Sequence, residues 1–161
     1  MPVTNDITAT YRAPRKSFSR FFARGPREDR ALAVLMGAAA IMFVANWPQL
    51  ARKAHLSGEE LNPLLGSALL GLMIFLPLIA YTLAALSFLI GKVFRSKASA
   101  FEARFALFWA LLAASPAYLL WGLVAGFIGP GAAMTLTGAL WLGVFLLFWG
   151  AGLWVAAKGT Q

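Results

Sequence analysis

The sequence contains no cysteine and only one histidine, and these scarcities exclude several kinds of site. Without cysteine there is no disulfide framework, thiolate nucleophile, iron–sulfur cluster or cysteine zinc site. The one histidine, His55, lies near Glu59 and Glu60 and is spaced i, i+4 from Glu59, but a zinc site needs at least three protein ligands, and three do not converge here. A solvated loop histidine is the better interpretation. We therefore predict no metal site and no cofactor.

Charged residues are also scarce, at 12% of the chain, whereas 60% of the residues are hydrophobic and the mean hydropathy is +0.73. The apolar residues fall into long runs of the length that a helix needs to cross a bilayer. The sequence therefore predicts an all-α, polytopic membrane protein with four transmembrane helices. The predicted spans cover about residues 31–47, 63–93, 101–128 and 134–157.

Proline and glycine divide these runs. Pro48 is expected to end the first span, because proline lacks a backbone N–H and clashes with the preceding turn. Pro77 is expected to kink the second span, and Pro116, directly after Ser115, the third. The alternative for the second span is a break at Pro77 into a re-entrant pair. The Gly129-Pro130-Gly131 turn is so short that the third and fourth spans are expected to form an antiparallel hairpin.

Local patterns also predict how the second span begins. Asn62 has the side chain of a helix N-cap, and Pro63 follows it. Just upstream, Ser57 and Glu60 have the Ser-x-x-Glu spacing of a capping box for a short preceding turn.

The charge, net +8 with a pI near 10.7, would suit a nucleic-acid-binding domain if it lay on a soluble fold. However, all 14 basic residues lie outside the apolar runs or at their ends. With the N-terminus in the cytoplasm, twelve of them lie on the cytoplasmic side, as the positive-inside rule requires. We therefore predict no nucleic-acid partner, cytoplasmic N- and C-termini, a basic N-terminal segment over residues 1–30, a transmembrane domain over residues 31–157 and a cytoplasmic tail over residues 158–161.

Residues 14–24, PRKSFSRFFAR, form a short basic amphipathic pattern within the N-terminal segment. Its three phenylalanines have the i, i+3, i+4 spacing of one helix face, with cations around the rest. Such a helix is expected to lie on an anionic leaflet; the alternative is ordinary charge that fixes the topology. The predicted lipid-surface residues are Arg15, Lys16, Phe18, Arg20, Phe21, Phe22 and Arg24.

No charged residue lies in the interior of a predicted span, where a pump or ion-coupled transporter usually has one. Glu102 and Arg104, at the mouth of the third span, are expected to be interface anchors. Ser115 is expected to satisfy carbonyls that Pro116 frees, rather than to act as a nucleophile. We therefore predict no catalytic residues and no enzyme activity.

Small residues spaced four apart let transmembrane helices approach closely. They predict packing within the monomer, particularly inside the hairpin of the last two spans; the alternative is oligomerisation or docking to another membrane protein. The predicted helix-packing residues are Ser67, Gly71, Gly122, Gly126, Ala139 and Gly143.

Three stretches carry a resemblance to a known family: TYRAPRKSFSRFF, REDRALAVLMGAAAIMFVANWPQLARKAHLSGEEL and FEARFALFWALLAASPAYLLWGLVAGFIGPGAAMTLTGALWLGVFLLFWGAGL. Over residues 10–155 the chain resembles a bacterial member of the Yip (Ypt-interacting-protein) domain family. The resemblance implies a multi-span, non-enzymatic protein of the inner (plasma) membrane. Eukaryotic members bind Rab-type GTPases through a long cytoplasmic N-terminal region, which is missing or replaced here.

These observations predict a scaffold or membrane-organising protein that acts through helix packing and contacts with lipids or proteins. The expected partners are membrane lipids and either a second copy of the chain or another membrane protein. Two alternatives are a small carrier or channel for a neutral solute and an accessory subunit of a larger membrane complex.

Overall fold

The computed structural model of the chain describes residues 3–159 and confirms the all-α prediction: these residues form helices and no β-strand. The last two residues of the predicted tail lie outside the described part. The helices are α1 (Val3–Arg12), α2 (Pro14–Ala23), α3 (Glu28–Ser57), α4 (Leu61–Leu70), α5 (Leu76–Val93), α6 (Ala100–Ala113), α7 (Ser115–Phe127) and α8 (Ala132–Lys158), with a π-helical turn, Gly71–Phe75, between α4 and α5.

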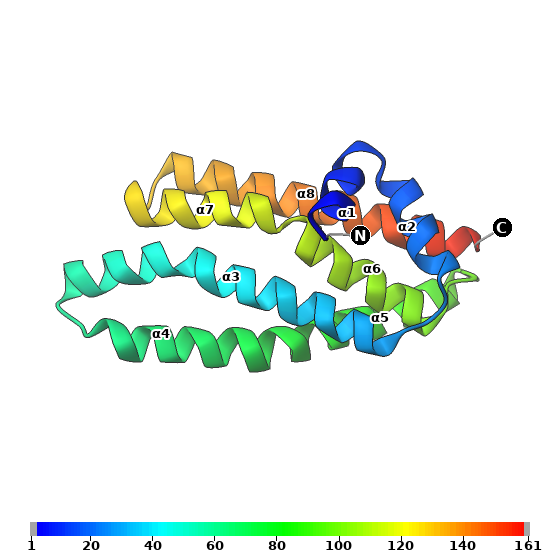
Figure 1. Cartoon of the computed structure of the whole chain (residues 1–161), viewed down its shortest axis with the longest axis horizontal. Coiled ribbons are helices and arrows are strands. Elements are labelled where there is room, and N and C mark those ends of the chain that lie inside the picture. The colour runs from blue at the N-terminus through cyan, green and yellow to red at the C-terminus, as the bar shows by residue number, and fades with distance from the viewer. Residues whose placement is uncertain (1–2, 160–161) are drawn as a thin grey trace.

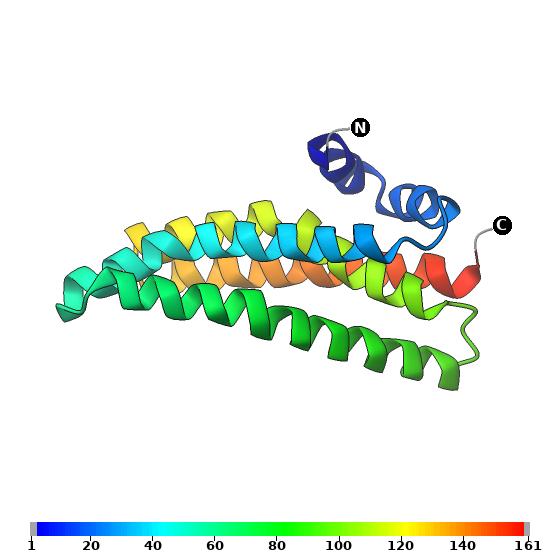
Figure 2. The same cartoon turned by 60° about the horizontal axis from the view of Figure 1, so that its bottom comes forward.

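Three helical stretches of residues 3–159 are long and apolar enough to cross a membrane: α3, Leu61–Val93 and α8. A fourth is present if the bent pair α6 and α7 makes one span. These stretches run side by side as an elongated bundle, and α1 and α2 form a helical hairpin that lies against one half of it (Figures 1 and 2). The structure therefore has the long apolar helices that the predicted membrane protein requires.

The prediction that Pro48 ends the first helix is wrong. Helix α3 continues through Pro48 to Ser57 and ends at Gly58, whose φ of 71° is left-handed and whose N–H donates to the Ala54 carbonyl. One proline removes one helical hydrogen bond, and a 30-residue helix packed against neighbours tolerates that loss. The packing is specific, because Pro48 lies against Gly126 of α7, where a Cβ would come within 2.3 Å of the proline Cβ.

The second long helix, Leu61–Val93, is continuous through Pro77. The π-helical turn lies directly before this proline, and the Leu76 N–H donates to the Gly71 carbonyl, five residues back. A π-helical turn is rare and occurs mostly as a single-turn bulge within an α-helix, and here it lies in the preceding turn, where the proline ring would otherwise clash with a carbonyl. The helix begins at Leu61 after Glu60, with no side-chain cap, so the predicted N-cap at Asn62 is wrong.

Helices α6 and α7 meet at 44°, with Ala114 between them and Pro116 in the first turn of α7. The start of α6 carries a complete capping box: the Ser99 hydroxyl accepts from the Glu102 N–H, and the Glu102 carboxylate accepts from the Ser99 N–H. The capping box predicted at Ser57 is wrong, because Ser57 is the last residue of α3. The serine that does form a capping box is Ser99, in the loop before α6.

Helix α3 packs most extensively against α7, and α7 also packs against α8, its predicted hairpin neighbour. The end of α7 is held by Arg52 of α3. Its Nη1 donates to the carbonyls of Gly126 at 3.3 Å and Phe127 at 3.4 Å. These carbonyls belong to the last turn of α7, where helical acceptors are left free and a cation also complements the helix dipole.

We expect the Arg52→Gln variant to lose about 1 to 2 kcal/mol of unfolding free energy, because the carbonyls at the end of α7 lose a charged donor. The measurement is a denaturation curve of the purified protein in mild detergent. Lys53→Gln is the matched control: Lys53 is mostly exposed and has one ion pair, with Glu59 at 3.8 Å, so its loss costs at most about 0.5 kcal/mol. Equal losses in the two variants would contradict the proposed role of Arg52.

Candidate functional site: the basic end of the bundle

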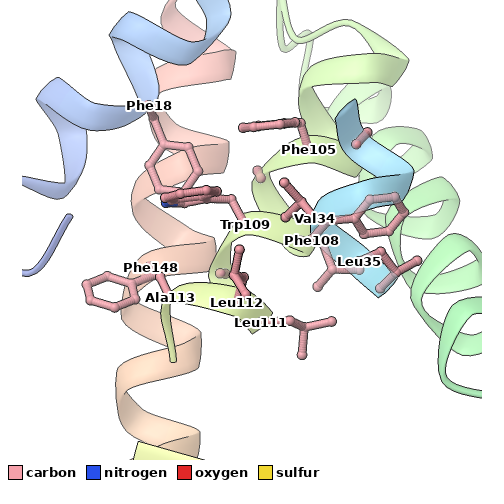
Figure 3. Close-up of a cluster of buried hydrophobic side chains, with 14 of the residues drawn as sticks. Phe18, Val34, Leu35, Phe105, Phe108, Trp109, Leu111, Leu112, Ala113 and Phe148 are labelled. Carbon is pink, nitrogen blue, oxygen red and sulfur yellow. The ribbon is translucent and has the colours of Figure 1, made fainter. Parts of the chain in front are cut away.

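The α1–α2 hairpin packs on α6 and α8 through aromatic side chains. Phe18 is fully buried, and its ring lies beside Gly152 of α8, where a Cβ would come within 2.9 Å of it. The Phe21 ring centroid is 4.5 Å from that of Trp109 on α6. Figure 3 shows Phe18 directed at Trp109, with Phe148 of α8 nearby. The hairpin is thus part of the hydrophobic core.

One hydrogen bond joins α1 to the same core. The Trp109 indole Nε1–H donates to the Thr10 hydroxyl oxygen at 3.0 Å, and both residues are buried. The Thr10 hydroxyl in turn donates to the Asp6 carbonyl at 2.8 Å. The buried Trp109 indole therefore has the hydrogen-bond acceptor that it needs. The Tyr11 ring of α1 also packs edge-on against Phe148, with centroids 4.9 Å apart, and partial burial raises the pKa of its phenol.

The structure corrects the predicted contact of the phenylalanines with lipid. Phe18, Phe21 and Phe22 are exposed by 0%, 4% and 6%, respectively, and they face α6 and α8 rather than a leaflet. The physical reason is that a protein groove and a bilayer offer the same apolar environment to an amphipathic helix. The predicted cations of this segment remain exposed, and they are Arg15, Lys16, Arg20 and Arg24.

Two cations stack on one tryptophan at the edge of the hairpin. The Arg15 guanidinium lies 4.2 Å from the centroid of Trp154, and the Lys158 ammonium lies 3.8 Å from the same ring. These three residues, with Ser19, line a cavity of about 570 Å³ between α2 and the end of α8. Cation–π contacts hold both charges in place without neutralising them.

The fold gathers the charge at this end of the bundle. The N-terminal segment, the end of α5, the α5–α6 loop, the start of α6 and the end of α8 lie together there (Figure 1), and they carry twelve basic and four acidic residues. The opposite end, at the α3–α4 loop, carries two of each: Arg52, Lys53, Glu59 and Glu60. The whole net charge of +8 therefore belongs to one end, which we call the basic end.

Arg104 and Glu102, predicted as anchors, lie at the basic end and have defined partners. Arg104 forms an ion pair with Glu28, which joins the start of α6 to the start of α3. Glu102 belongs to the capping box of α6.

The predicted helix-packing residues separate into two groups. Gly122 and Gly126 of α7 are packed, but against α3 rather than inside the α7–α8 hairpin. A Cβ on Gly122 would lie 2.0 Å from the Ala45 carbonyl oxygen. The other four residues do not bring helices together within the chain: Ser67, Ala139 and Gly143 are exposed, and a Cβ on Gly71 or Gly143 would meet no atom within 4 Å.

The remaining polar residues that could carry chemistry do not come together in one site. Within residues 3–159, no group of three histidine, cysteine or acidic residues is placed to hold a metal ion. Ser115 is buried at the junction of α6 and α7. Asn46 of α3 donates to the Met42 carbonyl at 2.8 Å and to the Tyr118 hydroxyl of α7 at 3.1 Å, so it joins two helices.

Helix α1 and the close approach at Gly152 were missed from the sequence. The signal for α1 was present: Ile7, Thr10 and Tyr11 have i, i+3, i+4 spacing and face the protein in part or in full. For Gly152, a Cβ would lie 2.8 Å from the Ala106 Cβ, so glycine allows α6, α8 and Phe18 to meet. No local pattern distinguishes this glycine from Gly150, whose added Cβ would meet nothing within 4 Å.

No family model, no curated protein and no solved structure matches the chain.

Proposed function

We propose that this chain is a non-enzymatic membrane scaffold, which presents a fixed basic surface at one face of the bilayer and packs against other membrane components. The observation that carries the proposal is the docking of the α1–α2 hairpin. Because its phenylalanines are inside the bundle, the cations on its outer side are fixed relative to the spans. A fixed array of charges can recognise anionic lipid headgroups or an acidic partner with less loss of conformational freedom than a mobile tail.

The exposed small-residue faces support the same proposal. Ala139 and Gly143 lie on the outer side of α8, and Gly143 has open space where a side chain would be. In a membrane, such a face allows close approach of another helix. Membership of the Yip domain family, location in the inner membrane and cytoplasmic termini belong to this proposal, and the charge asymmetry of the bundle supports the orientation.

The experiment is extraction of the tagged protein from its native membrane in mild detergent or polymer discs, followed by mass spectrometry and mass determination of the intact particle. We expect a partner, or a second copy of the chain, in fixed stoichiometry. A carrier would appear as an unaccompanied chain that moves a solute in liposomes, and an accessory subunit as one member of a larger complex. A lone monomer under several extraction conditions would refute the scaffold proposal.

Two variants show which surface holds the partner. Gly143→Leu fills the open face of α8, and the Lys16→Gln/Arg20→Gln double variant removes two exposed cations of α2. We expect at least one of them to release the partner. Val93→Gln, at an 80% exposed position near the end of α5, is the control and should keep the partner.

A further inference from the structure

We propose that a cavity between α5, α6 and α8 holds one acyl chain of an anionic phospholipid from the leaflet at the basic end. This inference deepens the proposed function and rests on it only in placing the bundle in a bilayer. The cavity has a volume of about 380 Å³ and is separate from the one at Arg15 and Trp154.

Small residues create the cavity. Helices α5 and α8 both pack against α6 and make little direct contact with one another. Gly91 of α5, Ala98 of the following loop, Ala103 of α6 and Ala157 of α8 line the space between them. Figure 2 shows the α5 ribbon separating from the rest of the bundle toward this loop. The site is therefore a lateral space between spans rather than a path along the bundle axis.

The lining is suited to a hydrocarbon chain. Phe88, Ile90, Phe94 and Leu153 add to the apolar wall. The volume is near the lower end of the range of small-molecule sites, about 300 to 1,000 Å³, so it fits one acyl chain rather than a whole lipid. The ring of Trp149 also lines the cavity.

The charge around the cavity selects the headgroup. Exposed Lys92, Arg95 and Lys97 alternate along the chain with lining residues from Gly91 to Ala98. The Lys92 ammonium lies 5.3 Å from the centroid of Phe88, another lining residue. The segment itself has no acidic residue, and Glu102, which follows it in the first turn of α6, accepts from the Ser99 N–H in the capping box. Unneutralised cations beside an apolar cavity are complementary to a lipid phosphate that carries net negative charge.

The α5–α6 loop holds these cations in place. The Ser96 N–H donates to the Gly91 carbonyl at 2.8 Å, and the Lys97 N–H donates to the Ala157 carbonyl of α8 at 3.4 Å. Arg95 lies in the left-handed region, with φ of 56°, at the end of α5, where glycine is the favoured residue. The loop therefore presents charge from an ordered turn.

The test uses purified full-length protein, incubated in detergent with phosphatidylglycerol or with phosphatidylcholine of the same acyl chains, and native mass spectrometry to count bound lipids. We expect one phosphatidylglycerol per chain, and phosphatidylcholine retained at least 10-fold less. Ala157→Phe, which fills the cavity from an exposed position, should lower phosphatidylglycerol retention about 10-fold. Ala85→Phe, exposed on α5 outside the cavity, should retain the lipid as the unaltered chain does.

A second variant keeps the test independent of cavity filling. Lys92→Gln/Lys97→Gln should lower phosphatidylglycerol retention by about 25-fold and so remove the preference for this lipid, since each basic residue near an anionic surface contributes about a 5-fold change in binding. Equal retention of the two lipids by the unaltered chain, or full retention by a folded Ala157→Phe variant, would overturn the inference. These outcomes concern purified protein and lipid, so they are distinguishable from failure of the scaffold proposal, which is judged by partner retention in native membranes.

Discussion

Gly122→Ala is expected to destabilise the bundle by about 3 kcal/mol, the upper part of the usual range for overpacking a core. The added Cβ would lie 2.0 Å from the carbonyl oxygen of Ala45 and 2.7 Å from its carbonyl carbon. Both are backbone atoms, which cannot rotate away as the end of a side chain can. Helix α3 must therefore move away from α7, and this contact is the most extensive in the molecule. A denaturant titration of the purified protein in detergent measures the loss.

Gly143→Ala is the matched control. Gly143 is also within a long helix of the predicted transmembrane domain, but a Cβ there would meet no atom within 4 Å. Alanine forms helices better than glycine by about 0.8 to 1 kcal/mol, so this variant should be as stable as the unaltered chain or slightly more stable. Equal losses of stability in the two variants would contradict the claim that Gly122 is needed for the close packing of α7 on α3.

Phe18→Ala is expected to cost about 3 to 5 kcal/mol and to release the α1–α2 hairpin. The Phe18 ring is fully buried between α2, α6 and α8, and alanine would leave a cavity at the centre of this contact. Because the linker at Arg24 and Arg27 then becomes more mobile, trypsin should cut it faster. The measurement is the rate of that cleavage in lipid nanodiscs, together with the thermal midpoint.

Phe127→Ala is the matched control, because it removes a phenylalanine ring that is not buried. Phe127 is 78% exposed, at the end of α7 remote from the hairpin, so its removal should change neither the cleavage rate nor the midpoint appreciably. Unchanged cleavage in Phe18→Ala would show that the hairpin is held by something other than its buried aromatic side chains.

The helical class and the approximate helix positions were predictable because bilayer-length apolar runs have few alternative structures. The ends of helices were less predictable. The sequence predicts that Pro48 ends the helix, yet α3 continues for nine residues beyond it, to Ser57, because Gly126 of the neighbouring helix makes room for the proline ring. That accommodation depends on a residue 78 positions away, which no local rule includes.

The environment of the N-terminal segment was unpredictable for a different reason. The i, i+3, i+4 spacing of Phe18, Phe21 and Phe22 predicts one apolar face, and α2 has that face. The spacing does not indicate whether lipid or protein covers it. The partner surface, formed by Trp109, Gly152 and their neighbours, exists only after α6 and α8 have packed together.

Small-residue motifs had the same ambiguity. Three motifs of equal spacing were present, and only the one at Gly122 and Gly126 packs within the chain. Helix rotation in the bundle decides which faces point inward, and that rotation depends on all neighbours at once. The lateral cavity at Ala157 could not be predicted for the same reason, since it depends on how far α5 lies from α8.

Cysteine labelling in sealed membranes is the most direct test of the central claim, a four-span bundle with its charge at one face of the bilayer. The chain has no native cysteine, so single variants report one position each. We predict that Ser19→Cys and Lys97→Cys react with a membrane-impermeant maleimide only from the cytoplasmic side, and that Ser57→Cys and Pro130→Cys react only from the other. All four positions are exposed in the fold. Labelling of Ser19 and Ser57 from the same side would contradict the account.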